Sequence, residues 1–120
     1  MSEYQDINTR TYNLSLRVLN FMDTIELKSI HSSIANQVIR SSCSIGANIA
    51  EGKSSTTKKE FSRYLEIALK SANETKYWLR LLKDFKKIEN PEIDYILNET
   101  DEISRIIAKS VLTIKKNTVK

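Results

Sequence analysis

The sequence predicts an all-α protein, folded over residues 1–120 as a single antiparallel up-down-up-down four-helix bundle. Three observations predict this fold. The 120 residues include only two glycines and one proline, too few for the turns of a β-sandwich or for a glycine-rich phosphate loop. Apolar residues recur at alternating steps of four and three, which is the heptad spacing of packed helices. The breaks in this spacing are short, and short connections favour antiparallel neighbours.

The first two helices are expected at about residues 4–27 and 30–51. The second has a small, polar stripe around Ser41 and Ile45, with Gly46 inside it. Gly52 is predicted to end this helix in a left-handed conformation, which glycine adopts without steric cost. The heptad seam of the first helix consists of Ile7, Thr11, Leu14, Val18, Phe21 and Ile25.

The third and fourth helices are expected at about residues 57–88 and 91–116. Thr57 and Glu60 form a capping-box pattern, in which each side chain accepts a hydrogen bond from a backbone amide of the other residue. Asn90 is predicted to cap the fourth helix, with Pro91 at its first position. The seam of the third helix consists of Phe61, Leu65, Ala68, Ala72, Thr75, Leu79 and Leu82.

The composition is that of a soluble, cytoplasmic protein. Hydrophobic residues make up 40% and charged residues 28% of the chain, which is ordinary for a globular domain. No apolar run is long enough to span a membrane, and the N-terminus lacks the features of a signal peptide. We therefore expect no membrane partner, and the single Cys43 cannot form an internal disulfide.

The apolar surface of the third helix is wider than one bundle core requires. Trp78, Leu81 and Phe85 extend it beyond the seam. One interpretation is that this long helix contacts two neighbours within its own bundle. The other is that these three residues form an oligomer interface, because large aromatic side chains concentrate at interfaces. The two interpretations are compatible.

Basic residues concentrate on the third helix and the loop before it. Residues 53–89 contain ten basic and five acidic residues, whereas the other segments are close to neutral. We call Lys53, Lys58, Lys59 and Arg63 the turn cluster. We call Lys76, Arg80, Lys83 and Lys87 the ridge. Such charges are typical of a solvated face, but a ring of protomers would repeat them and multiply contacts to nucleic-acid phosphates.

Residues suited to catalysis or metal binding are sparse, so we predict no enzymatic activity, no metal site and no cofactor. His31 is the only histidine, and no cysteine or carboxylate lies at metal-ligand spacing from it. Cys43 has no base nearby in the sequence, which favours a packing role. The glutamates of the third helix lack the Glu-x-x-His pattern of di-iron bundles.

The second and third helices carry a recognisable motif in three stretches. These are Arg40 to Gly52 (RSSCSIGANIAEG), Lys59 to Ala68 (KEFSRYLEIA) and Ser71 to Leu79 (SANETKYWL). The motif resembles the small bacterial four helix bundle protein family, also called the ribosomal RNA intervening-sequence protein family. More remotely, the chain is similar to the accessory variability determinant of diversity-generating retroelements.

The resemblance implies a homopentameric ring of four-helix protomers with no known catalytic activity and a role in nucleic-acid binding. Relatives linked to retroelements contact a reverse transcriptase and RNA through a basic surface. Many relatives have proline at the position of Gly46. The motif residues that carry over are Ser44, Asn48, Ala50, Glu51, Gly52, Phe61, Leu65, Ala68, Ser71 and Glu74.

These matched residues favour architecture over chemistry. Small side chains permit close helix approach, and a buried Asn48 would need internal hydrogen-bond partners. Glu51 lies near a helix C-terminus, where its charge is unfavourable, so we expect a basic partner among Lys53, Arg63 and Arg40.

Our leading hypothesis is a non-enzymatic oligomeric bundle that binds RNA, DNA or a nucleoprotein such as a reverse transcriptase through the turn cluster and the ridge. The alternative is a structural or protein-interaction adaptor, in which the charge only maintains solubility.

Overall fold

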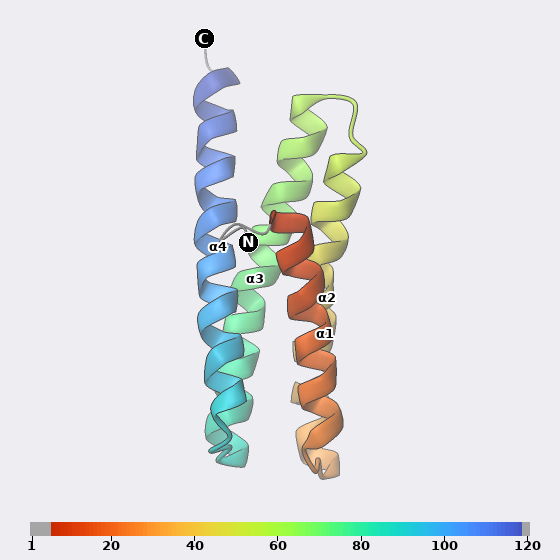
Figure 1. Cartoon of the computed structure of the whole chain (residues 1–120), viewed down its shortest axis with the longest axis vertical. Coiled ribbons are helices and arrows are strands. Elements are labelled where there is room, and N and C mark those ends of the chain that lie inside the picture. The colour runs from red at the N-terminus through yellow and green to blue at the C-terminus, as the bar shows by residue number, and fades with distance from the viewer. Residues whose placement is uncertain (1–5, 119–120) are drawn as a thin grey trace.

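The computed structural model describes residues 6–118, and every regular element in this part of the chain is a helix. The predicted all-α class is therefore confirmed. The four helices lie side by side along the longest dimension of a molecule that measures 52 × 34 × 21 Å (Figure 1). They are α1 (Ile7–Thr24), α2 (Ser29–Lys53), α3 (Lys58–Lys86) and α4 (Pro91–Thr118).

The helix bounds agree with the expected ones to within one to three residues, where they can be compared. The largest difference is at the end of α1, which stops at Thr24 rather than Leu27. Residue 4, where this helix was expected to begin, lies outside the described residues.

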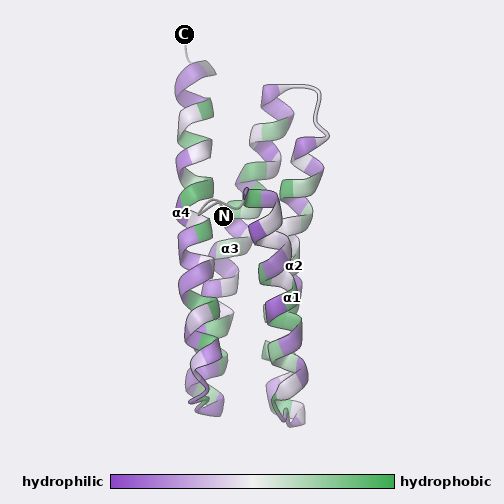
Figure 2. Ribbon diagram, in the orientation of Figure 1, coloured by the Kyte–Doolittle hydropathy of each residue, from purple (hydrophilic) through white to green (hydrophobic). Residues whose placement is uncertain are grey.

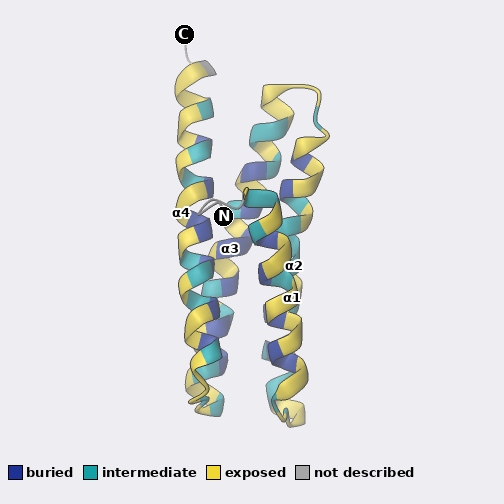
Figure 3. Ribbon diagram, in the orientation of Figure 1, coloured by how far each residue is buried: buried dark blue, intermediate teal, exposed yellow. Residues whose placement is uncertain are grey.

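Helices that are consecutive in the sequence pack against each other, and α1 also packs against α4. Each helix alternates hydrophobic and hydrophilic residues along its length (Figure 2), and the buried positions follow the apolar ones (Figure 3). The predicted seams form the core, because Val18, Val38, Leu79 and Ile96 are all fully buried. Helix α1 is the shortest, so the end of the bundle at the α2–α3 turn lies beyond its first residue (Figure 1).

The predicted caps at the starts of α3 and α4 are present. Thr57 Oγ1 accepts a hydrogen bond from the Glu60 amide at 3.1 Å, and Asn90 Oδ1 accepts one from the Glu92 amide at 2.9 Å. The Glu60 carboxylate accepts from the Thr56 amide at 3.4 Å, one residue before the partner expected for a capping box.

The predicted left-handed end at Gly52 is wrong. Gly52 is helical, and α2 continues to Lys53. Among the described residues, the positive φ belongs to Lys87, at 59°, which ends α3. Tertiary packing accounts for Gly52, because a β-carbon there would lie 3.2 Å from Phe61 and from Tyr64 on α3. Glycine is needed for the close approach of two helices rather than for a turn.

Candidate nucleic-acid interface

The matched motif residues of α2 and α3 join the two helices through a hydrogen-bonded seam. Ser44 Oγ lies 2.9 Å from Ser71 Oγ, and Thr75 Oγ1 lies 2.9 Å from Ser41 Oγ. Asn48 Nδ2 donates to the carbonyl oxygen of Ser44 at 2.8 Å. Because hydroxyl groups are short and satisfied here, the helices approach closely without leaving buried polar groups unpaired. The motif supports architecture at these positions.

The remaining motif residues divide between packing and the surface. Leu65 is buried and Phe61 packs against the core, whereas Glu51 and Glu74 are exposed. Glu51 forms no ion pair within residues 6–118, so the expected partner from Lys53, Arg63 or Arg40 is wrong. Exposure to water explains this, since a solvated carboxylate needs no protein partner.

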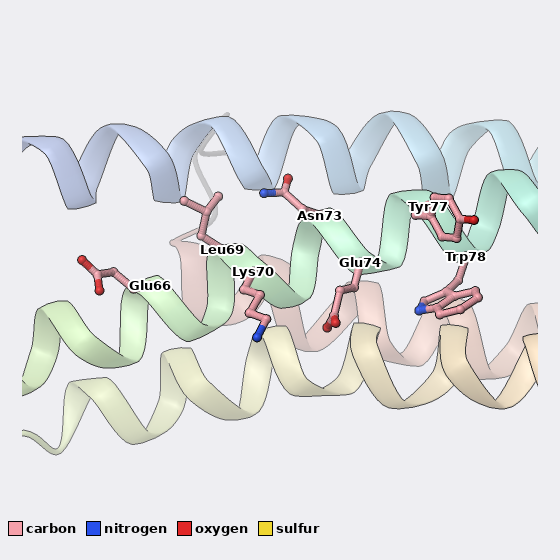
Figure 4. A pocket seen from close by; sticks show the side chains of 7 residues that line it. All are labelled: Glu66, Leu69, Lys70, Asn73, Glu74, Tyr77 and Trp78. Carbon is pink, nitrogen blue, oxygen red and sulfur yellow. The ribbon is translucent and has the colours of Figure 1, made fainter.

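A surface groove of about 520 Å³ runs along α3 (Figure 4). It holds Glu74 and Trp78, which point toward α2, and Asn73, which points toward α4. Its full lining is Glu66, Leu69, Lys70, Asn73, Glu74, Tyr77 and Trp78. This set contains no histidine, cysteine or serine, so it offers no nucleophile paired with a base.

His31 and Cys43 take structural positions. His31 Nδ1 accepts a hydrogen bond from the Lys28 amide at 3.1 Å at the start of α2, and its ring packs edge-on against Phe85. Cys43 is a half-buried free thiol on α2. Over residues 6–118, no group of three or more His, Cys, Asp or Glu side chains is arranged to hold a metal ion.

Two of the four ridge cations form ion pairs with α4. Lys76 Nζ lies 3.1 Å from Asp101 Oδ1 and donates to Ser104 Oγ at 3.2 Å. Lys83 Nζ lies 2.6 Å from Asp94 Oδ1. The other two, Arg80 and Lys87, are exposed.

The Lys76 pair also sets the ionisation of its carboxylate. The hydrogen bond from Lys76 lowers the pKa of Asp101, and the charge of Arg105 adds to the effect. A lowered pKa means that ionised Asp101 favours the folded state above its ordinary pKa, and that this contribution is lost as pH falls through the lowered value. Lys76 therefore remains paired throughout the neutral range.

The turn cluster lies at the opposite end of α3, and all four of its side chains are exposed. Within the described residues, no carboxylate lies within ion-pair distance of Lys58, Lys59 or Arg63. Lys53 is closer to an acid, because its charge helps to lower the pKa of Asp6, although the hydrogen bond from the Thr9 backbone is the main cause.

A groove of about 570 Å³ lies beside these cations. Its lining residues are Thr57, Lys58, Lys59, Glu60, Ser62, Arg63, Glu66 and Ile114. Both of its carboxylates are already engaged, because Glu60 caps the turn and Glu66 lies 2.9 Å from Lys115 Nζ of α4. The cations therefore dominate the free charge of this groove.

Lys58 and Lys59 occupy the first two positions of α3. The N-terminal end of a helix carries a partial positive charge, so each lysine there disfavours the helix by about 0.3–1 kcal/mol. Lys53, by contrast, stands in the last turn of α2, where a cation is favourable. Helix stability alone does not account for the two lysines at the start of α3.

Sequence reasoning missed Asp94 and Asp101, the acids that hold the ridge. A signal was present, because these aspartates are seven residues apart and so are Lys76 and Lys83. The earlier lysine pairs with the later aspartate. The same crossed spacing links Arg10 with Glu99 at 2.8 Å and Arg17 with Glu92 at 2.6 Å, between α1 and α4.

The candidate oligomer interface is only partly buried in the protomer. Trp78 packs against the core and meets the Tyr77 ring edge-on. Leu81 and Phe85 are 37% and 48% exposed. Part of the wide apolar face thus serves the bundle itself, and part remains open to solvent.

In the described part of the chain, no helix combines the length and the apolar character that crossing a membrane requires.

Comparison with known proteins places the chain among small helical proteins. A family model described as 23S rRNA-intervening sequence protein matches residues 3–109. The crystal structure of a protein of unknown function from the S23 ribosomal protein family of Bacteroides thetaiotaomicron is similar, with 29% identity and a TM-score of 0.77. That match covers 88% of this chain and 98% of the other. No curated protein matches the chain.

Proposed function

The chain belongs to the 23S rRNA-intervening sequence protein family, and from this membership we propose that it is a non-enzymatic, oligomeric bundle that binds nucleic acid through the basic surface of α3. One observation carries the proposal. Lys58, Lys59 and Arg63 are exposed on one end of the bundle and have no carboxylate partner among residues 6–118. Cations in this state can neutralise phosphates and release their counterions, which supplies most of the affinity of non-specific nucleic-acid binding.

Simple solubility explains this cluster less well than binding does. Charges that only maintain solubility can stand anywhere on the surface. Lys58 and Lys59 instead occupy helix positions that disfavour cations. Natural proteins accept such local costs chiefly where function requires them.

We further propose an antiparallel up-down-up-down order of the helices and assembly into a homo-oligomer, a pentamer by the resemblance described above. The crossed spacing of the ion pairs between α3 and α4, and between α1 and α4, supports the antiparallel order. The exposed Leu81 and Phe85, next to Trp78, supply an apolar surface for a neighbouring protomer.

Nucleic-acid binding is tested by fluorescence anisotropy with labelled RNA and DNA duplexes, together with the mass of the protein in solution. We expect binding that weakens steeply between about 50 and 200 mM salt, because phosphate contacts dominate. We expect a mass several times that of the 13.8 kDa protomer. A monomer that binds neither duplex at low salt would contradict the proposal.

The alternative is an adaptor that binds protein and not nucleic acid, for example a reverse transcriptase or another nucleoprotein component. The exposed apolar residues Ile30, Leu81 and Phe85 favour it. In that case Trp78→Ala or Phe85→Ala disturbs assembly, whereas reversal of the basic residues has no effect on nucleic-acid retention. The anisotropy measurement separates the two functions.

A further inference from the structure

We propose that the turn cluster, and not the ridge, contacts nucleic acid, and that its ligand is a base-paired nucleic acid held through its phosphates. This inference rests on the proposed function and assigns it to one end of α3. It concerns the groove of about 570 Å³ beside Lys58, Lys59 and Arg63.

The first argument is the state of the cations before any ligand arrives. At the ridge, Lys76 and Lys83 are already paired with Asp101 and Asp94. A phosphate that binds there must displace these carboxylates or accept their repulsion. At the groove, the lining cations have no such partners within residues 6–118, and both lining carboxylates are engaged elsewhere. Phosphate binding at the groove therefore breaks no ion pair of a cluster residue.

The second argument is the set of groups that the groove presents. Two lysines and one arginine stand beside the hydroxyl groups of Thr57 and Ser62. Lysine, arginine and hydroxyl side chains are the groups that contact phosphate and sugar in protein–nucleic acid complexes. The amides at the start of α3 add partial positive charge on the same side. The cations and the helix end thus act in the same direction.

The third argument identifies the form of the nucleic acid. Proteins that bind single strands stack successive bases on aromatic side chains, and no aromatic residue lines this groove. The nearby Phe61 and Tyr64 are half-buried and lie against α2 at Gly52. The aromatic residues of α3 that are exposed, Tyr77 and Phe85, lie along the distant half of the helix. A groove of cations without a stacking surface suits the regular phosphate backbone of a duplex.

The test compares two variants with the same charge change, each altering one lysine and one arginine. The turn variant is Lys59→Glu/Arg63→Glu and the ridge variant is Arg80→Glu/Lys87→Glu. All four positions are exposed. We measure anisotropy with RNA duplex, DNA duplex and single strands of equal length. Thermal unfolding followed by circular dichroism establishes that each variant is folded, and Lys59→Gln/Arg63→Gln replaces the turn variant if it is not.

We expect the turn variant to bind duplex about a hundredfold more weakly and to lose about two from the salt slope, one per phosphate contact. The ridge variant should remain within about threefold of the natural protein, and single strands should bind about tenfold more weakly than duplexes. Equal losses in both variants, a larger loss in the ridge variant, or preferred single-strand binding would overturn this inference while the proposed function stands. If the natural protein binds none of the nucleic acids, the proposed function itself fails.

Discussion

The two basic clusters of α3 are alike in sequence and different in structure. Each contains three lysines and one arginine. In the ridge, Lys76 and Lys83 lean on α4, and their side chains are 29% and 36% exposed. In the turn cluster all four side chains are exposed, and α4 supplies Lys115 rather than an aspartate to the neighbouring groove. The availability of a cation is thus decided by the helix that packs beside it.

The contrast should be reversible if the aspartates of α4 cause it. Asp94→Asn/Asp101→Asn removes both partners and leaves Lys76 and Lys83 free. We expect duplex affinity to rise about tenfold, because two cations become available for phosphates. Anisotropy at constant salt measures the change.

A matched control for this variant is Asp23→Asn/Glu26→Gln, which makes the same change in net charge at exposed positions near the end of α1. It should raise affinity by less than about threefold, because charges beyond a Debye length are screened. If both variants strengthen binding equally, the ion pairs do not restrain the ridge.

A smaller effect should distinguish the clusters by stability. Lys58→Gln/Lys59→Gln removes two cations from the start of α3 and should raise the free energy of unfolding by about 0.5–1 kcal/mol. Arg80→Gln/Lys87→Gln should leave it unchanged or lower it, because Lys87 stands at the C-terminal end of the same helix. Urea denaturation measures both values.

The opposite order of stabilities would mean that Lys58 and Lys59 stabilise the fold. Their placement would then need no functional explanation.

Most of the fold could be predicted because its signals are local. The Asn90 cap depends on neighbours in sequence, and the heptad seams repeat within each helix. Gly52 was misinterpreted because its sequence context suits a helix end, whereas its role is set by Phe61 and Tyr64 on the next helix.

The candidate site could be predicted only in part for the same reason. The sequence locates every lysine and arginine of α3, and an excess of charge is visible without a structure. Which of them is neutralised depends on the register between α3 and α4. That register is a tertiary property, although the equal spacing of Lys76 and Lys83 and of Asp94 and Asp101 contains a trace of it.

Lysine acetylation followed by mass spectrometry tests the central claim most directly, with the natural protein compared free and saturated with RNA duplex. Lys58, Lys59 and Lys87 are all exposed, so we expect each of them to react in the free protein. The account predicts that duplex protects Lys58 and Lys59 and leaves the reaction of Lys87 unchanged. Protection of Lys87 with full reaction of Lys58 and Lys59 would contradict it.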